Sequence, residues 1–248
     1  MMIRDFLRAH PLAISAVLAI LMGGVSAWAI YRSTAGPAGK AEMELVVRDY
    51  ILAHPEIIPQ AIDKLRERQG QDVYAGNKAA LETPFASAWA GAEHGDVTLV
   101  MFTDYACGYC RSSLPDVNRL IASDPRLKVV WREIPILGPG SEIAAKAGLA
   151  AARQGAFREF HERMFAAGPP DGTKVSAVLR GMKLDNERVA RDAASPEVAA
   201  ELRQNLELAG KIDESIATPT FVVSGRLLKG AVGYDALKQA VEEARRRT

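Results

Sequence analysis

The sequence predicts an α/β fold in which a block of helices is inserted among the strands. Apolar runs of the length expected for buried strands occur at residues 97–102, 127–134 and 220–223. Helical signals follow the first run, and a longer helical block at about 141–211 separates the second run from the third. The order strand, helix, strand, helical block, hairpin, helix indicates one α/β domain without internal repeats.

Size and composition are those of a globular protein with one substantial core and a small appendage. The chain has 248 residues and a mass of 26.8 kDa, and 48% of its residues are hydrophobic while 25% are charged. The formal net charge is +1, and no basic stripe is interleaved with aromatic residues. The composition therefore gives no indication of a nucleic-acid partner.

An uncharged segment at residues 11–30 follows Arg4 and Arg8. A helix of this length would rise about 30 Å, enough to span the core of a bilayer. Positive charge before such a helix predicts a cytoplasmic N-terminus and an exported remainder. Residues 1–31 are therefore expected to act in export, as a signal anchor or as a signal peptide.

Two fates of this segment compete. Trp28 and Tyr31 would suit the interfacial belt of a retained inner-membrane anchor, which we favour. However, Ala27-Trp28-Ala29 also fits a cleavage site of A-x-A type, and cleavage there would leave a soluble product. Either fate predicts a periplasmic, extracytoplasmic location for the rest of the chain, where disulfides persist.

Residues 32–40 are expected to form a linker, because Ser, Gly and Pro are frequent there. Residues 41–82 are expected to form a helical region of two pieces, with Pro55 in the opening turn of the second. The apolar positions of that piece recur at helical spacing and are Ile58, Ile62 and Leu65. So thin a stripe needs a partner, which would be the main domain, the membrane surface or another copy of the chain.

The main domain is expected over residues 83–248. Its first helix follows the first strand and contains Pro115. Gly, Pro and Asp residues divide the helical block into predicted helices at 142–153, 157–165, 175–179, 186–193 and 195–208. Residues 220–228 read as a hairpin around Ser224-Gly225, and a helix at 234–246 closes the domain.

Cys107 and Cys110 are the only cysteines, and they form a C-x-x-C motif where the first helix of the main domain should begin. Unpaired backbone N–H groups and the positive end of the helix dipole favour a thiolate at that position. The thiolate is the attacking form in disulfide exchange, and a second cysteine three residues later can resolve a mixed disulfide. The motif therefore predicts redox chemistry, with Cys107 as the nucleophile and Cys110 as the resolving thiol.

Three other uses of the pair fit less well. Structural zinc takes four ligands, and the chain has neither a second cysteine pair nor an H-x3–5-H spacing among its four histidines. A disulfide across two residues closes a tiny loop and would stabilise a large domain little. Copper(I) suits soft thiolates, as in a metallochaperone, but no Met-rich or His-rich tract accompanies the pair. No metal or organic cofactor is implied.

Residues 84–246 resemble the DsbA-like branch of the thioredoxin superfamily. The resemblance rests on Cys107-Gly108-Tyr109-Cys110 after an apolar strand, on a proline in the following helix, on the helical block, and on Ala217-Thr218-Pro219-Thr220-Phe221, which looks like the family's cis-proline loop. It implies a thioredoxin fold with inserted helices, and a cis bond between Thr218 and Pro219 beside the dithiol. These two residues would then shape a groove in which the neighbouring backbone pairs with an extended client.

Two details qualify this resemblance. Many relatives carry a buried acid six residues before the first cysteine, where this chain has Met101. Asp104 is an alternative proton relay, although it would equally cap the helix or face water. Gly108-Tyr109 resembles the pair found in disulfide isomerases as well as in this subgroup, so it leaves the direction of the reaction open.

Residues 49–58 also resemble the N-terminal helical region of the copper-sensitivity and outer-membrane-associated DsbA-like proteins, which drives oligomerisation in some relatives. The sequence thus indicates an exported thiol–disulfide oxidoreductase. Its expected partners are cysteine-containing exported proteins, a membrane redox partner, the membrane through the N-terminal segment and further copies of the chain. Oxidation of clients is the favoured direction, with isomerase or reductase activity as the alternative if the helical region assembles copies.

Overall fold

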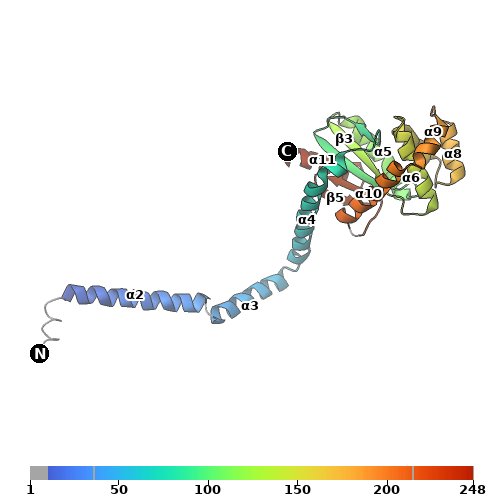
Figure 1. The fold of residues 1–248 in the computed structure, drawn as a ribbon. Helices are drawn as coiled ribbons and strands as arrows, with labels where there is room; N and C mark the ends of the chain where they lie inside the picture. The colour runs from blue at the N-terminus through green and yellow to red at the C-terminus, as the bar shows by residue number, and fades with distance from the viewer. Residues whose placement is uncertain (1–10, 36, 214, 248) are drawn as a thin grey trace. The chain divides into compact units, whose positions relative to one another are not determined.

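The computed structural model describes residues 11–35, 37–213 and 215–247, and the chain divides into two compact units between Lys64 and Leu65 (Figure 1). The first unit consists of α2 (Pro11–Ala35), α3 (Pro37–Ala53) and the beginning of α4 (Ile57–Glu82). The second unit contains the rest of α4 and the α/β domain. Arg4 and Arg8, on which the predicted orientation of the N-terminal segment depends, lie outside the described residues.

The first unit bears on two expectations. Residues 32–35 and 37–40, within the segment expected to form a linker, are helical. Pro37 is the first residue of α3, and a proline there removes only an N–H that has no partner within the helix. The membrane anchor expected over residues 11–30 is not supported. Among the described residues, no helix is both long and apolar enough to cross a membrane.

The prediction of a two-piece helical region is confirmed, since α3 ends at Ala53 and α4 begins just after Pro55. Along the second piece, the predicted stripe and the following turns differ. Ile58, Ile62 and Leu65 remain exposed, whereas Tyr74 and Leu81 further along are buried. They lie in a core cluster that includes Val100, Phe102, Ile134, Val222, Leu208 and Ile212. The second part of α4 is therefore part of the α/β domain.

A mixed five-stranded sheet forms the centre of the domain, in the order β1-β3-β2-β4-β5. Its strands are β1 (Trp89–Gly91), β2 (Val97–Thr103), β3 (Leu127–Glu133), β4 (Thr220–Val223) and β5 (Arg226–Lys229). The pair β2–β3 is parallel and the other pairs are antiparallel. All the predicted strands are present. The additional strand β1 spans three residues, which is too short for an alternating pattern to be recognised.

Seven helices are described in the domain after α4, and they match the predicted order. They are α5 (Gly108–Ser123), α6 (Pro139–Ala152), α7 (Phe157–Ala166), α8 (Gly172–Arg180), α9 (Asn186–Ala193), α10 (Pro196–Ile212) and α11 (Tyr234–Arg247). Side-chain caps explain several starts. Asp171, Asp185 and Ser195 each accept a hydrogen bond from the backbone N–H three residues later. In Figure 1, α8 and α9 lie at the opposite end of the domain from α11.

Alternation along the central strands separates two cores. Leu99 and Met101 of β2 face one side of the sheet together with Cys107, Cys110 and residues of α5, α6, α7 and α11. Val100 and Phe102 face the other side and pack against α4 and α10. The dithiol therefore lies on the face of the sheet that α5 and α7 cover.

The β4–β5 hairpin turns at Ser224 and Gly225, as predicted, with φ of 46° and 81°. Gly225 packs closely on α4, because a Cβ at this position would lie 2.8 Å from the Cα of Gln71. Reciprocally, a Cβ at Gly70 would lie 2.9 Å from the carbonyl oxygen of Gly225. The absence of side chains at both glycines lets the turn approach the helix backbone.

Candidate dithiol site

The two cysteines lie at the start of α5 in different environments. Cys107 is the N-cap residue, and its Sγ accepts a hydrogen bond from the backbone N–H of Cys110 at 3.4 Å. The exposed fraction is 6% for Cys107 and 0% for Cys110. Of the two cysteines, only Cys107 keeps any exposure to solvent, and its sulfur receives a helix N–H that stabilises negative charge.

The second wall of the site comes from the loop before β4. Strand β4 pairs with β2, with Phe221 opposite Met101, and this pairing brings residues 217–219 to the start of α5. The Cys107 thiol donates a hydrogen bond to the carbonyl oxygen of Thr218 at 3.2 Å. The peptide bond between Thr218 and Pro219 is cis, which confirms the expectation drawn from the sequence.

Burial determines the protonation state of the resolving thiol, Cys110. It raises the pKa of Cys110 to about 12, and the nearby Thr103 hydroxyl lowers that pKa only in part. Cys110 is therefore a neutral thiol at neutral pH. Whenever it acts as a leaving group or as an attacking group, a proton has to be delivered or removed within the protein interior.

Asp104 is not solvent-facing, because only 1% of it is exposed. Its carboxylate accepts hydrogen bonds from the backbone N–H groups of Ala106, Ile136 and Leu137 and from the Ser141 hydroxyl, at 2.6 to 3.0 Å. The helix cap is supplied by Cys107 and not by Asp104. Asp104 thus joins the turn before the dithiol to the loop before α6.

A buried polar cluster, which the sequence pattern did not predict, lies at the end of β3. Glu133 and His161 are 0% and 1% exposed, and Glu133 Oε1 is 3.6 Å from His161 Nδ1. His161 Nδ1 is also 3.2 Å from the Tyr105 hydroxyl. Neither Glu133 oxygen has a hydrogen-bond partner of ordinary geometry among the described residues. The rings that contact His161 belong to Tyr105, Trp131, Phe157 and Phe165.

Burial disfavours the charged form of both ionisable groups in this cluster. Burial raises the pKa of Glu133 well above its ordinary value, the Tyr105 hydroxyl opposes the shift, and the negative charge of Asp104 adds to it. Burial lowers the pKa of His161 to about 3. One signal was available in the sequence, since Glu133 continues the alternation of Leu127, Val129 and Trp131 on the buried face of β3.

Exposed hydrophobic side chains lie on two segments connected to the dithiol. Tyr109, between the cysteines, is 70% exposed. Ile136 and Leu137 are exposed too, on the loop that Asp104 holds through its carboxylate.

The sequence comparisons agree with this geometry. The family described as "DSBA-like thioredoxin domain" matches residues 98–242, more than half of the chain. The chain belongs to the DSBA-like thioredoxin-domain family. Residues 40–71 match the family "Copper resistance protein ScsC N-terminal domain", which agrees with the resemblance seen in the helical region.

Solved structures of relatives cover most of the chain. A thioredoxin-like oxidoreductase from Silicibacter pomeroyi is 40% identical, with a TM-score of 0.65, and the match covers 68% of this chain and 98% of that one. A Proteus mirabilis ScsC variant, which carries a linker deletion and one substitution, is 27% identical with a TM-score of 0.68. That match covers 86% of this chain and 97% of the variant.

Curated relatives are of two kinds. Disulfide bond formation protein D of Bacillus subtilis is 25% identical over 193 residues, which cover 72% of this chain and 84% of that protein. The Na(+)/H(+) antiporter NhaA 3 of Salinispora tropica is 33% identical over 159 residues, covering 62% of this chain. The match covers only 24% of the antiporter's length, and is confined to a part of that protein.

Proposed function

We propose that the protein exchanges disulfides with cysteine-containing exported proteins through Cys107 and Cys110. One observation carries the proposal. A slightly exposed sulfur at a helix start, Cys107, lies between a fully buried thiol, Cys110, and the carbonyl of Thr218. The arrangement separates an attacking sulfur from a resolving sulfur, as disulfide exchange requires.

In the oxidising direction, a client thiolate attacks Sγ of Cys107 in the Cys107–Cys110 disulfide. The Cys107–Cys110 bond breaks, and Cys110 leaves with the electron pair. A second client thiolate then attacks the client sulfur of the mixed disulfide and releases Cys107 as a thiolate. The client has lost two electrons and gained a disulfide, and the protein has become a dithiol.

The client is held beside the sulfur by the loop that contains Thr218 and Pro219. The backbone of this loop is positioned to pair with an extended segment of the client. Tyr109, Ile136 and Leu137 supply apolar contacts. These features favour unfolded clients, whose hydrophobic side chains and backbone are accessible.

Turnover on a reduced, unfolded client tests the assignment of the two sulfurs. The oxidised protein should form disulfides in the client, and Cys107→Ser should abolish this activity. Cys110→Ser should accumulate a mixed disulfide instead of product. Turnover by Cys107→Ser at the wild-type rate would refute the assignment.

Oxidation is the direction that we propose, with a membrane redox partner that restores the disulfide after each cycle. The DSBA-like architecture with its inserted helices supports this choice. The equilibrium reduction potential of the protein against glutathione measures the direction. A potential well above that of glutathione is expected for an oxidant, and a lower value would indicate a reductase.

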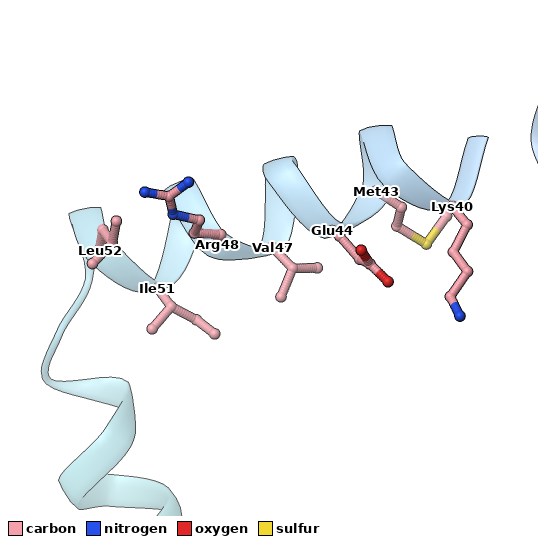
Figure 2. Close-up of a pocket in the computed structure, with 7 residues that line it drawn as sticks. All are labelled: Lys40, Met43, Glu44, Val47, Arg48, Ile51 and Leu52. Atoms are coloured by element: carbon pink, nitrogen blue, oxygen red, sulfur yellow. The ribbon is translucent and has the colours of Figure 1, made fainter. Parts of the chain in front are cut away.

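Isomerisation is a second candidate, favoured by the exposed apolar side of α3. Figure 2 shows Met43, Val47 and Ile51 projecting from one side of this helix, where they line a shallow hollow together with Leu52. Met43 and Val47 are exposed to 63% and 51%. We propose that this surface joins copies of the chain, which would present several dithiols to one misfolded client.

We also propose that the protein acts in the periplasm, with residues 11–30 directing its export. The positive charges of Arg4 and Arg8 before this uncharged segment support the orientation. N-terminal sequencing of the mature protein decides the fate of the segment. An intact N-terminus shows a retained segment, whereas a start at Ile30 shows cleavage after Ala29.

A further inference from the structure

Two buried polar side chains lie on the face of the sheet that carries the dithiol. Thr103 and Glu133 are both 0% exposed. Neither the Thr103 hydroxyl oxygen nor the two Glu133 carboxyl oxygens make a hydrogen bond of ordinary geometry with any described residue. Burying a polar group without a hydrogen bond is unfavourable. The presence of both groups on this face therefore points to a functional role.

Strand register places the two residues side by side. β2 and β3 are parallel neighbours, and Thr103 is directly opposite Glu133. Paired residues on adjacent strands are about 4.8 Å apart and point to the same face of the sheet. This is the face that carries Met101 and the buried sulfur of Cys110. The Thr103 hydroxyl is close enough to Cys110 to lower the pKa of its thiol.

We propose that Thr103 and Glu133 form a proton relay for Cys110. The inference rests on the proposed exchange at Cys107 and Cys110, and it supplies a residue for the proton step of that exchange. Glu133 acts through the Thr103 hydroxyl and does not contact the sulfur itself.

The step balances in both directions. When a client thiolate attacks Cys107, Cys110 leaves as a thiolate and takes the proton of the Thr103 hydroxyl. Thr103 in turn takes the proton of the Glu133 carboxyl, so Glu133 becomes a carboxylate. In the reverse direction, Cys110 attacks a mixed disulfide at Cys107. Its proton then returns through Thr103 to the Glu133 carboxylate.

The groups that face Glu133 favour its protonated form. Asp104 at the end of β2 is acidic, Tyr105 is a neutral phenol, and His161 on α7 is neutral because of its burial. None of these groups carries a positive charge that would stabilise a carboxylate at Glu133. Arg132 points to the opposite face of the sheet, where it binds Glu201.

Asp104 is less suited to this task. All the hydrogen bonds of its carboxylate go to the loop before α6, to Ala106 and to Ser141. Protonating it would release these donors. Glu133, in contrast, makes no hydrogen bond of ordinary geometry that a change of its charge would break.

A rapid-quench experiment tests the relay in the full chain. The oxidised protein is mixed with a single-cysteine peptide between pH 5 and pH 9, and the mixed disulfide is counted by mass spectrometry. Glu133→Gln, which is isosteric with the protonated acid, should slow its formation about 10- to 100-fold at pH 7, within the range of positioned acid–base groups. Thr103→Val should produce the same loss, and the double variant should lose no more than either single one. Once rates are divided by the thiolate fraction of the peptide, the pH dependence that the wild type still shows should flatten in all three variants.

Glu201→Gln is the matched control, because it makes the same change at a carboxyl that pairs with Arg132 on the other face. It should keep the wild-type rate and pH profile. If Glu133→Gln and Thr103→Val both keep them as well, the relay is refuted, while loss of exchange in Cys107→Ser would still support the proposed function. If Cys107→Ser exchanges normally, the assignment of the sulfurs fails first. Should Glu133→Gln not fold, Thr103→Val alone decides.

Discussion

At Cys107 and Cys110, one turn of helix gives two thiols opposite properties. Cys107 receives a helix N–H and remains accessible, whereas burial holds Cys110 in its protonated form. Brief alkylation of the reduced protein should therefore modify Cys107 and leave Cys110 unmodified until the chain is unfolded. Peptide mapping by mass spectrometry measures this selectivity, and equal modification of both sulfurs in the folded protein would contradict it.

The buried carboxyl of Glu133 predicts a dependence of stability on pH. The unfolded chain releases this proton near the ordinary pKa of 4.5, whereas the folded chain retains it to a much higher pH. The contribution of Glu133 to the free energy of unfolding is therefore full below pH 4.5. It is lost as pH rises through the folded pKa, by up to about 1.4 kcal/mol per pH unit.

Glu133→Gln does not titrate, so its free energy of unfolding relative to the wild type should increase with pH above 4.5. Urea denaturation at pH 5, 6, 7 and 8 measures the difference. His161, whose pKa burial lowers to about 3, destabilises both proteins equally as pH falls below its ordinary value, so its effect cancels. A difference that stays constant across these pH values would show that Glu133 is already charged in the folded state.

Among the elements, α4 depends most on one side chain of the sheet. Arg132 of β3 is 2% exposed, and its guanidinium donates hydrogen bonds to the carbonyl oxygens of Ala80, Leu81 and Thr83 at the end of the helix. It also forms an ion pair with Glu201 of α10 at 2.7 Å. Arg132 thus connects strand β3 to both α4 and α10.

Arg132→Met should lower the free energy of unfolding by about 3–5 kcal/mol, because it leaves Glu201 and several carbonyls buried without their partner. Chemical denaturation measures the loss. Arg126→Met is the matched control, since Arg126 is 64% exposed in its pair with Asp96, and it should change stability by no more than about 0.5 kcal/mol. Similar losses in the two variants would contradict a specific role for Arg132.

At the scale of helices and strands, the sequence predicted the strands and most helices, because their signals are local. Apolar runs marked β2 and β3, and Pro and Ser marked the start of α10. Two features were missed because they depend on the tertiary structure. Burial of Glu133 follows from the packing of His161 from α7, and the hydrogen bonds of Asp104 come from a loop more than 30 residues away. Neither partner is visible in the local pattern.

The molecule as a whole presents one reactive sulfur for each chain, so its assembly decides how many dithiols meet a client. The stripe expected to bind a partner, Ile58, Ile62 and Leu65, is exposed, as is the apolar side of α3. We expect the chain that begins at Ile30 to be oligomeric in light scattering. A monomer at micromolar concentration would contradict this and favour an oxidant that acts alone.

Substitutions on α3 test whether copies of the chain contact each other through this helix. Val47→Glu combined with Met43→Glu should shift the oligomer to monomer, because charges would face each other across the interface. Leu45→Glu is the control, since Leu45 is similarly exposed at 55% but does not line the hollow in Figure 2. Equal effects of the control and the double variant would indicate that any added charge unfolds α3, and would not support a contact at Met43 and Val47.

The central claim is that Cys107 alone attacks, and trapping of a mixed disulfide tests it most directly. The reduced Cys110→Ser and Cys107→Ser variants are each incubated with oxidised glutathione at neutral pH, and the adduct is located by peptide mass mapping. We predict rapid formation of a stable glutathione adduct on Cys107 in the Cys110→Ser variant, and none on Cys110 in the Cys107→Ser variant. Equally rapid formation of an adduct on Cys110 would contradict the account.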